Sequence, residues 1–142
     1  MTHLHTAENR LHQARNVPSA LDAACDAFED ILGVIGSYEE AATSTGTAIV
    51  FLLVATQAAN GRDALLFAPS LPRRSLHPRP AVGQPGRGSA SDIKAAVAGL
   101  SRLLASRLAC TATAAAGADQ IACHAAARYA RKVHGLLAGK DP

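Results

Sequence analysis

A chain of 142 residues has the usual size of one domain and can bury a hydrophobic core without disulfides or metals. Its formal net charge of +3 is local, because residues 69–91 alone carry +4 and the rest of the chain therefore carries −1. A nucleic-acid-binding domain usually spreads positive charge over a face or a helix of its folded surface, so this distribution argues against that class.

The start of the chain and its most apolar run indicate where the protein works. The opening residues MTHLHTAENR contain no apolar segment, so we expect no secretory signal. The most apolar run, TAIVFLLVA at 47–55, has nine residues, whereas a bilayer span needs about 20, so we expect no membrane span. Abundant alanine and an excess of arginine over lysine suggest a bacterial genome. We expect a cytoplasmic protein.

The first two helices are predicted from regularly spaced apolar residues. A short helix is expected over 2–16, where Thr2 can cap the start and Pro18 ends the segment. A second helix is expected over 18–41, with that proline in its first turn. Its apolar residues recur in steps of four and three over three heptads: Val17, Leu21, Ala24, Phe28, Ile31, Ile35 and Tyr38. This period is typical of packing in antiparallel bundles.

The opposite side of the second helix carries an acidic stripe and two glycines. The residues are Asp22, Asp26, Glu29 and Asp30, followed by Gly33 and Gly36. Glycine in a helix costs about 1 kcal/mol relative to alanine, so the pair indicates close approach of another helix or local flexibility. We predict that this stripe is exposed and binds a protein partner.

A third helix is expected to start after the polar TST at 43–45 and to run to about Asn60–Gly61, followed by one more apolar turn, DALLFA. Because AIVFLLVA is apolar on all sides, this helix is predicted to be the most buried element. Ser91 and Asp92 can cap a fourth helix that runs to about residue 116. Gly117 breaks it, and Asp119 can cap a fifth helix that ends at Gly139.

No segment alternates with a period of two, so the chain is predicted to be all-α. We expect a four-helix bundle with a short extra N-terminal helix and a long crossover between the third and fourth helices. The single domain (1–142) then consists of a helical half at 2–68, a tether at 69–91 and a helical hairpin at 92–138. At about 3.3 Å per residue the tether could run the length of the bundle, so crossover and up-down topologies both stay open.

The tether, PSLPRRSLHPRPAVGQPGRGSAS, has two interpretations. It could be a proline-stiffened crossover, or a basic arm for nucleic acid, a membrane or an acidic partner. Its four arginines (Arg73, Arg74, Arg79 and Arg87) would make only a salt-sensitive contact, and no aromatic residue is present to stack on a base. Long connections of this kind are usually linkers or functional segments, and here the crossover interpretation is favoured.

Two clusters could hold a metal or a small molecule. HTAENRLH places His5, Glu8 and His12 on one helix face, and imidazole and carboxylate suit zinc. A further ligand would be needed, and a solvated polar face explains the same spacing. A small apolar molecule could instead lie among the aromatic residues Phe28, Tyr38, Phe51 and Tyr129. The high alanine content works against such a pocket, because alanine lets helices pack closely.

The three cysteines, Cys25, Cys110 and Cys123, lack metal-ligand spacing and are expected to be reduced residues that fill gaps. Cys110 and Cys123 lie almost symmetrically about Gly117, so a redox pair stays open, as does a site formed by Cys110 and His124.

His124, Arg128 and Arg131 form a basic stripe on the last helix, with Lys132 at its edge. This stripe could bind an anion or an acidic partner. It could equally be solvated, or face the acidic stripe within one bundle or between two copies.

Motifs of common enzyme classes are missing from the sequence. The chain has no Glu-x-x-His pair, phosphate-binding GxxxxGK[ST] loop, HExxH or GxSxG. We therefore expect no catalysis and no cofactor. The leading hypothesis is a self-associating interaction or adaptor module that uses the acidic stripe and the basic Arg128 and Arg131. The alternatives are a ligand-binding or sensing bundle and a DNA-associated regulator that uses the tether.

Overall fold

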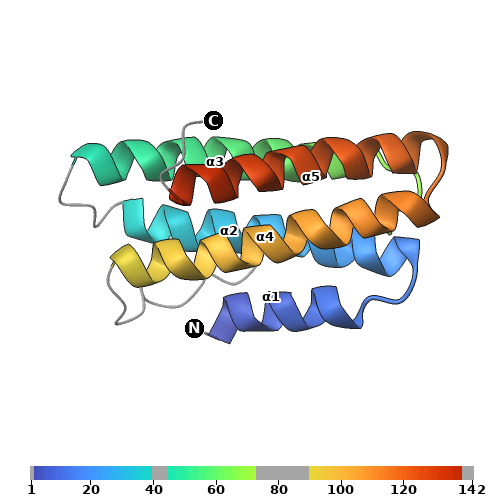
Figure 1. The fold of residues 1–142 in the computed structure, drawn as a ribbon, viewed down its shortest axis with the longest axis horizontal. Coiled ribbons are helices and arrows are strands. Elements are labelled where there is room, and N and C mark those ends of the chain that lie inside the picture. The colour runs from blue at the N-terminus through green and yellow to red at the C-terminus, as the bar shows by residue number, and fades with distance from the viewer. Residues whose placement is uncertain (1, 40–44, 73–89, 139–142) are drawn as a thin grey trace.

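A computed structural model describes residues 2–39, 45–72 and 90–138, and these residues are all-α, as predicted (Figure 1). They form five helices: α1 (Thr2–Gln13), α2 (Val17–Glu39), α3 (Thr45–Leu66), α4 (Ala90–Ala114) and α5 (Gly117–Leu137). No strand is present in this part of the chain.

The four longer helices lie side by side along the length of the molecule, and α1 lies beside α2 and α4 (Figure 1). Helix α5 packs on both α3 and α4, and α2 likewise contacts both of these helices. The apolar side of α1, formed by Leu4, Ala7 and Leu11, is fully buried in the same core. The first helix is therefore an integral part of the core and not an appendage.

The junction between α1 and α2 is fixed by Asn16, a cap that the sequence analysis overlooked. Its side-chain Oδ1 accepts a hydrogen bond from the backbone N–H of Ser19 at 2.8 Å, and the Ser19 hydroxyl oxygen accepts one from the backbone N–H of Asn16 at 3.3 Å. These reciprocal bonds satisfy N–H groups that a helix start otherwise leaves without partners. At the end of α1, Arg107 of α4 donates to the Ala14 carbonyl at 3.1 Å.

The predicted apolar side of α2 forms the centre of the core. Leu21, Phe28 and Ile31 are fully buried. The Phe28 ring lies against Gly61 of α3, where an added Cβ would be 2.4 Å from two ring atoms. Gly61, predicted as the end of the third helix, therefore lies inside α3 and permits its close approach to α2.

The predicted burial of α3 is wrong for one of its sides. Phe51 and Val54 are fully buried, but Ile49 and Leu52 on the outer side are 53% and 55% exposed. A helix that is apolar all round needs neighbours on every side to be buried, whereas α3 contacts mainly α2 and α5. Its outer side therefore faces solvent.

The first residues of the tether are attached to the start of α5. Asp119 accepts hydrogen bonds from the Ser70 backbone N–H, at 2.9 Å, and from the Ser70 hydroxyl. Asp119 was predicted to cap α5, but Ala116 occupies the cap position and makes no side-chain hydrogen bond there. Residues 73–89, which hold the four arginines of the tether, lie outside the described residues.

Candidate functional site

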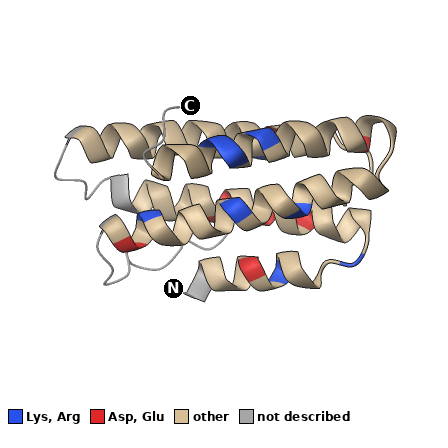
Figure 2. Cartoon of the chain, in the orientation of Figure 1, with Lys and Arg blue, Asp and Glu red and all other residues tan. Residues whose placement is uncertain are grey.

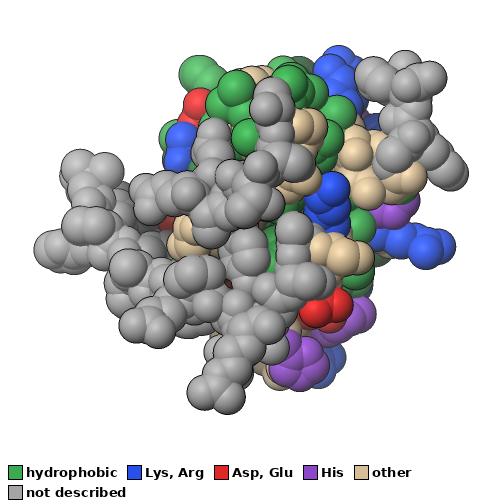
Figure 3. All heavy atoms as spheres, turned by 90° about the vertical axis from the view of Figure 1, so that its left-hand side faces the viewer, with side chains coloured by type: hydrophobic (Ala, Val, Ile, Leu, Met, Phe, Trp, Pro, Cys, Tyr) green, Lys and Arg blue, Asp and Glu red, His purple; other side chains and the backbone are tan. Residues whose placement is uncertain are grey.

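The outer face of α3 is the first candidate surface. Near the start of the helix it presents Ile49, Leu52 and Leu53, the last of them 43% exposed. These residues follow the i, i+3, i+4 spacing that places side chains on one side of a helix. Figure 3 shows hydrophobic side chains gathered at the top of the molecule, over this part of α3. Scattered exposed apolar residues are normal, but a continuous group of large ones indicates an interaction surface.

Further exposed apolar residues lie at the other end of α3. Leu66 is 55% exposed and Phe67, directly after the helix, is 81% exposed. Ile121 in the first turns of α5 is also exposed. By length and composition alone, Gly46–Leu66 is apolar enough to cross a membrane, a test that core helices of soluble proteins also pass. The absence of a membrane span therefore stays a prediction.

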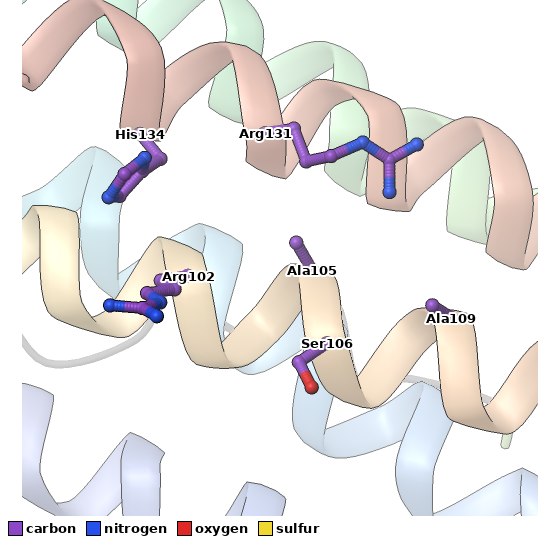
Figure 4. A pocket seen from close by; sticks show the side chains of 6 residues that line it. All are labelled: Arg102, Ala105, Ser106, Ala109, Arg131 and His134. Atoms are coloured by element: carbon purple, nitrogen blue, oxygen red, sulfur yellow. The ribbon is translucent and has the colours of Figure 1, made fainter.

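A basic groove between α4 and α5 is the second candidate surface. Its lining residues are Arg102, Ala105, Ser106 and Ala109 of α4 and Arg131 and His134 of α5, and its volume is about 400 Å³. Arg102 and His134 lie opposite each other at one end, while the Arg131 side chain extends toward the other end (Figure 4). The groove therefore presents positive charge from two helices over a floor of small side chains.

The acidic stripe is not the exposed surface that the sequence predicts. Arg10 of α1 donates hydrogen bonds to Asp26 and, at 3.2 Å, to Asp22. Partial burial lowers the pKa of Arg10, but the hydrogen bonds and charges of Asp26 and Asp22 raise it by more, so the net shift is upward. Asp30 is only 6% exposed, and Glu29 is half-buried. Asp22 and Asp26 of the stripe thus hold α1 on α2 within one chain.

One of the two glycines of the stripe, Gly36, does not mark a close contact between described helices. Gly36 is exposed, and a Cβ added there would meet nothing within 4 Å. Gly33 offers its carbonyl to the Ser37 hydroxyl at 3.0 Å, a bond inside the helix. A close approach between two described helices occurs at Gly61, on α3.

Of the four aromatic residues predicted to surround an apolar ligand, the structure describes the side chains of Phe28, Phe51 and Tyr129, and none of these lines the groove between α4 and α5. Phe28 and Phe51 are fully buried core residues. Tyr129 is half-buried, and the Lys132 Nζ lies 5.3 Å from the centroid of its ring, a cation–π contact. The Tyr38 side chain lies outside the described residues.

The predicted metal ligands His5, Glu8 and His12 all lie on α1, where both histidines are exposed. Across residues 2–39, 45–72 and 90–138, no three His, Cys, Asp or Glu side chains gather as a metal site requires. The structure therefore does not assemble these three residues into a site.

The cysteines differ in their environments. Cys25 and Cys123 are buried and Cys110 is exposed, and none of the three forms a disulfide in the described structure. Burial raises the pKa of the Cys123 thiol to about 11, and the Asp119 carboxylate adds to the rise. A thiol with this pKa stays protonated at neutral pH and is a poor nucleophile, so Cys123 is suited to packing.

The basic stripe of α5 is exposed at His124, Arg128 and Arg131, but only Arg131 lines the groove. Arg102 and His134, the other basic residues of the groove, were not predicted from the sequence. One available signal was the absence of Asp and Glu from residues 93–118 and 120–137. On α4 and α5 the acidic residues therefore lie near the helix starts and basic ones follow (Figure 2).

No family model matches this chain, and neither a curated protein nor a solved structure is detectably similar to it.

Proposed function

We propose that this protein is a non-catalytic interaction module that self-associates through the outer face of α3. The observation that carries the proposal is the exposure of Ile49, Leu52 and Leu53 on one side of a core helix. Complete burial of a large apolar side chain stabilises a folded protein by about 1.5–3 kcal/mol. Three such side chains left in water forgo a stabilisation that is large beside the net stability of a small domain. A partner that covers them recovers that free energy.

A second copy of the chain is the partner that fits this face best. Residues 45–61 contain no Lys, Arg, Asp or Glu, so two copies can bring this segment together without burying a charge. Such a contact is self-complementary when two α3 helices cross about a two-fold axis, the commonest symmetry of soluble oligomers. Asp63, beyond the segment, is paired with Arg62 at 3.1 Å and would lie at the rim.

The overall architecture proposed with this function is a four-helix bundle of α2 to α5, with α1 covering one side and residues 69–91 crossing from α3 to α4. The pairwise packing of the helices and the attachment of Ser70 to Asp119 support this arrangement. The cytoplasmic location, the bacterial origin and the lack of a cofactor stay predictions.

The test is the oligomeric state of the purified protein, measured by light scattering coupled to size exclusion at about 10–100 µM, the range of a moderate Kd. The monomer mass is 14.6 kDa, and we expect the wild-type protein at twice this mass. Leu52→Glu is expected to give a monomer, because dimerisation would bury an unpaired charge. Ala95→Glu is the matched control, since it places the same charge at an exposed position of α4 and should stay dimeric.

A monomeric wild type, or a Leu52→Glu variant that stays dimeric, contradicts the proposal. Flotation with phosphatidylcholine vesicles tests the alternative that the α3 face docks on a membrane. A monomer that floats with vesicles and loses this property on Leu52→Glu substitution would show that the α3 face docks on a membrane, and would replace self-association.

A further inference from the structure

The groove between α4 and α5 combines three groups that can carry positive charge with a floor that cannot repel a ligand. Arg102 and Arg131 each contribute a guanidinium group, and His134 contributes an imidazole ring. Ala105, Ser106 and Ala109 are the small side chains between them (Figure 4). The groove therefore has a charged rim and an open floor.

Within the described part of the chain, the basic side chains of the groove are not engaged by other residues. Neither Arg102, Arg131 nor His134 makes an ion pair or a side-chain hydrogen bond with another residue in the described structure. By contrast, Arg10 and Arg62 each pair with an aspartate, and Arg107 donates to a carbonyl oxygen.

Among the described residues, no carboxylate lines the groove. On the described part of α4 and α5 the acidic residues are Asp92 and Asp119, each in the first turn of its helix, and neither lines the groove. Asp119 accepts two hydrogen bonds from Ser70. The described side chains that line the groove are therefore basic or neutral, and an anion that enters it meets donors from both helices.

We propose that this groove binds a small organic phosphate, with the phosphate group between Arg102 and His134 and a second anionic or polar group toward Arg131. A planar guanidinium donates two parallel hydrogen bonds to phosphate oxygens, and Ser106 offers a further hydroxyl. A volume of about 400 Å³ lies within the size range of small-molecule sites and exceeds the needs of a single inorganic ion. This inference is independent of the α3 face.

The probe is inorganic pyrophosphate, which carries two linked phosphate groups, and inorganic phosphate is the comparison. We expect saturable binding by isothermal titration calorimetry at constant ionic strength, tighter for pyrophosphate than for phosphate. An exposed arginine–anion pair contributes up to about fivefold in affinity, so Arg102→Gln and Arg131→Gln should each weaken binding by roughly three- to fivefold. Their combination should weaken it by more than about tenfold.

Arg128→Gln is the matched control, because Arg128 is exposed on the same helix but does not line the groove. Arg128→Gln should leave the affinity for pyrophosphate within about twofold of the wild-type value, because it removes only a screened, long-range attraction between charges. Arg102, Arg128 and Arg131 are all exposed, so the three substitutions should leave the fold intact, which far-UV circular dichroism checks.

Three results overturn the proposal. The first is no saturable binding of pyrophosphate at millimolar concentration. The second is an Arg128→Gln effect as large as that of Arg131→Gln, which would mean attraction to the whole basic face. The third is binding of an acidic peptide such as hexaglutamate, sensitive to the same arginines, while pyrophosphate fails to bind. That result would assign the groove to an acidic protein segment.

Discussion

Replacement of Gly61 with alanine tests a close contact between α3 and the Phe28 ring of α2. A Cβ atom at this position would lie 2.4 Å from Cε1 and Cζ of Phe28 and 3.0 Å from Cε2. Carbon atoms in contact normally lie about 3.5–4.0 Å apart, and Phe28 is fully buried, so the ring or the helix must move. Overpacking of this kind costs about 1–3 kcal/mol.

Gly99→Ala is the matched control, because Gly99 is inside α4, is exposed, and a Cβ there would meet nothing within 4 Å. Replacement of a glycine inside a helix with alanine raises the free energy of unfolding by about 1 kcal/mol where the added methyl group causes no clash. We therefore expect Gly99→Ala to raise the free energy of unfolding by about 1 kcal/mol. The same gain offsets part of the clash at position 61, so Gly61→Ala should lower the free energy of unfolding by about 0–2 kcal/mol.

Urea denaturation followed by far-UV circular dichroism measures both variants. A double-mutant cycle isolates the contact: in a Phe28→Leu background the clash is relieved, and Gly61→Ala should become as favourable as Gly99→Ala. Equal stabilisation by both alanines in the wild-type background would refute the contact between Gly61 and Phe28 and the helix spacing inferred from it.

Three further predictions concern groups whose partners are described above. Arg10→Gln should lower the free energy of unfolding by about 1–3 kcal/mol, because two aspartates lose a charged hydrogen-bond donor; urea denaturation of this variant beside Arg15→Gln, an exposed arginine, checks this. Cys123 has a folded pKa of about 11 against an ordinary value of 9.0, so the folded state keeps a proton that the unfolded state loses. Stability should fall as the pH rises from about 9 to 11, and urea denaturation of Cys123→Ala should show a shallower fall. Asp119→Ala should speed amide exchange at Ser70, measured by NMR, and unchanged exchange would show that the hydrogen bond does not hold the segment.

The helical core was predictable because its signal is local. The steps of four and three along α2 correctly identified Leu21, Phe28, Ile31 and Ile35 as buried residues, and the apolar spacing of α1 did the same for Leu4. The relevant period is a property of the helix itself and needs no knowledge of the neighbouring elements.

The ion pairs and the glycine contact could not be predicted in this way. Arg10 lies 12 and 16 residues from its two aspartates, so their meeting depends on how α1 folds back over α2. The importance of Gly61 likewise depends on where the Phe28 ring lies. Asn16 is different, because Asn-x-x-Ser before a helical segment resembles a capping box and was available in the sequence.

The error about α3 has a physical cause that also bears on function. A helix with apolar residues on every side has no preferred inward face, so hydrophobicity alone cannot say how many neighbours cover it. In this fold two helices cover most of its inner side, and the outer residues Ile49 and Leu52 stay in water. What reads in the sequence as a fully buried helix is, in the structure, a helix with an open apolar face.

The two proposed surfaces, the outer face of α3 and the groove between α4 and α5, are separated by α5. We therefore predict that dimerisation and pyrophosphate binding are independent. One side of α5 packs on α3 and the other borders α4, where Arg131 and His134 line the groove. In Figure 3 hydrophobic side chains gather at the top, and cationic and histidine side chains lie along the right-hand side. A dimer formed through α3 therefore leaves the groove open, and pyrophosphate should bind wild-type dimer and Leu52→Glu monomer with equal affinity. A difference of more than about fivefold would mean that the two sites are coupled, by about 1 kcal/mol or more.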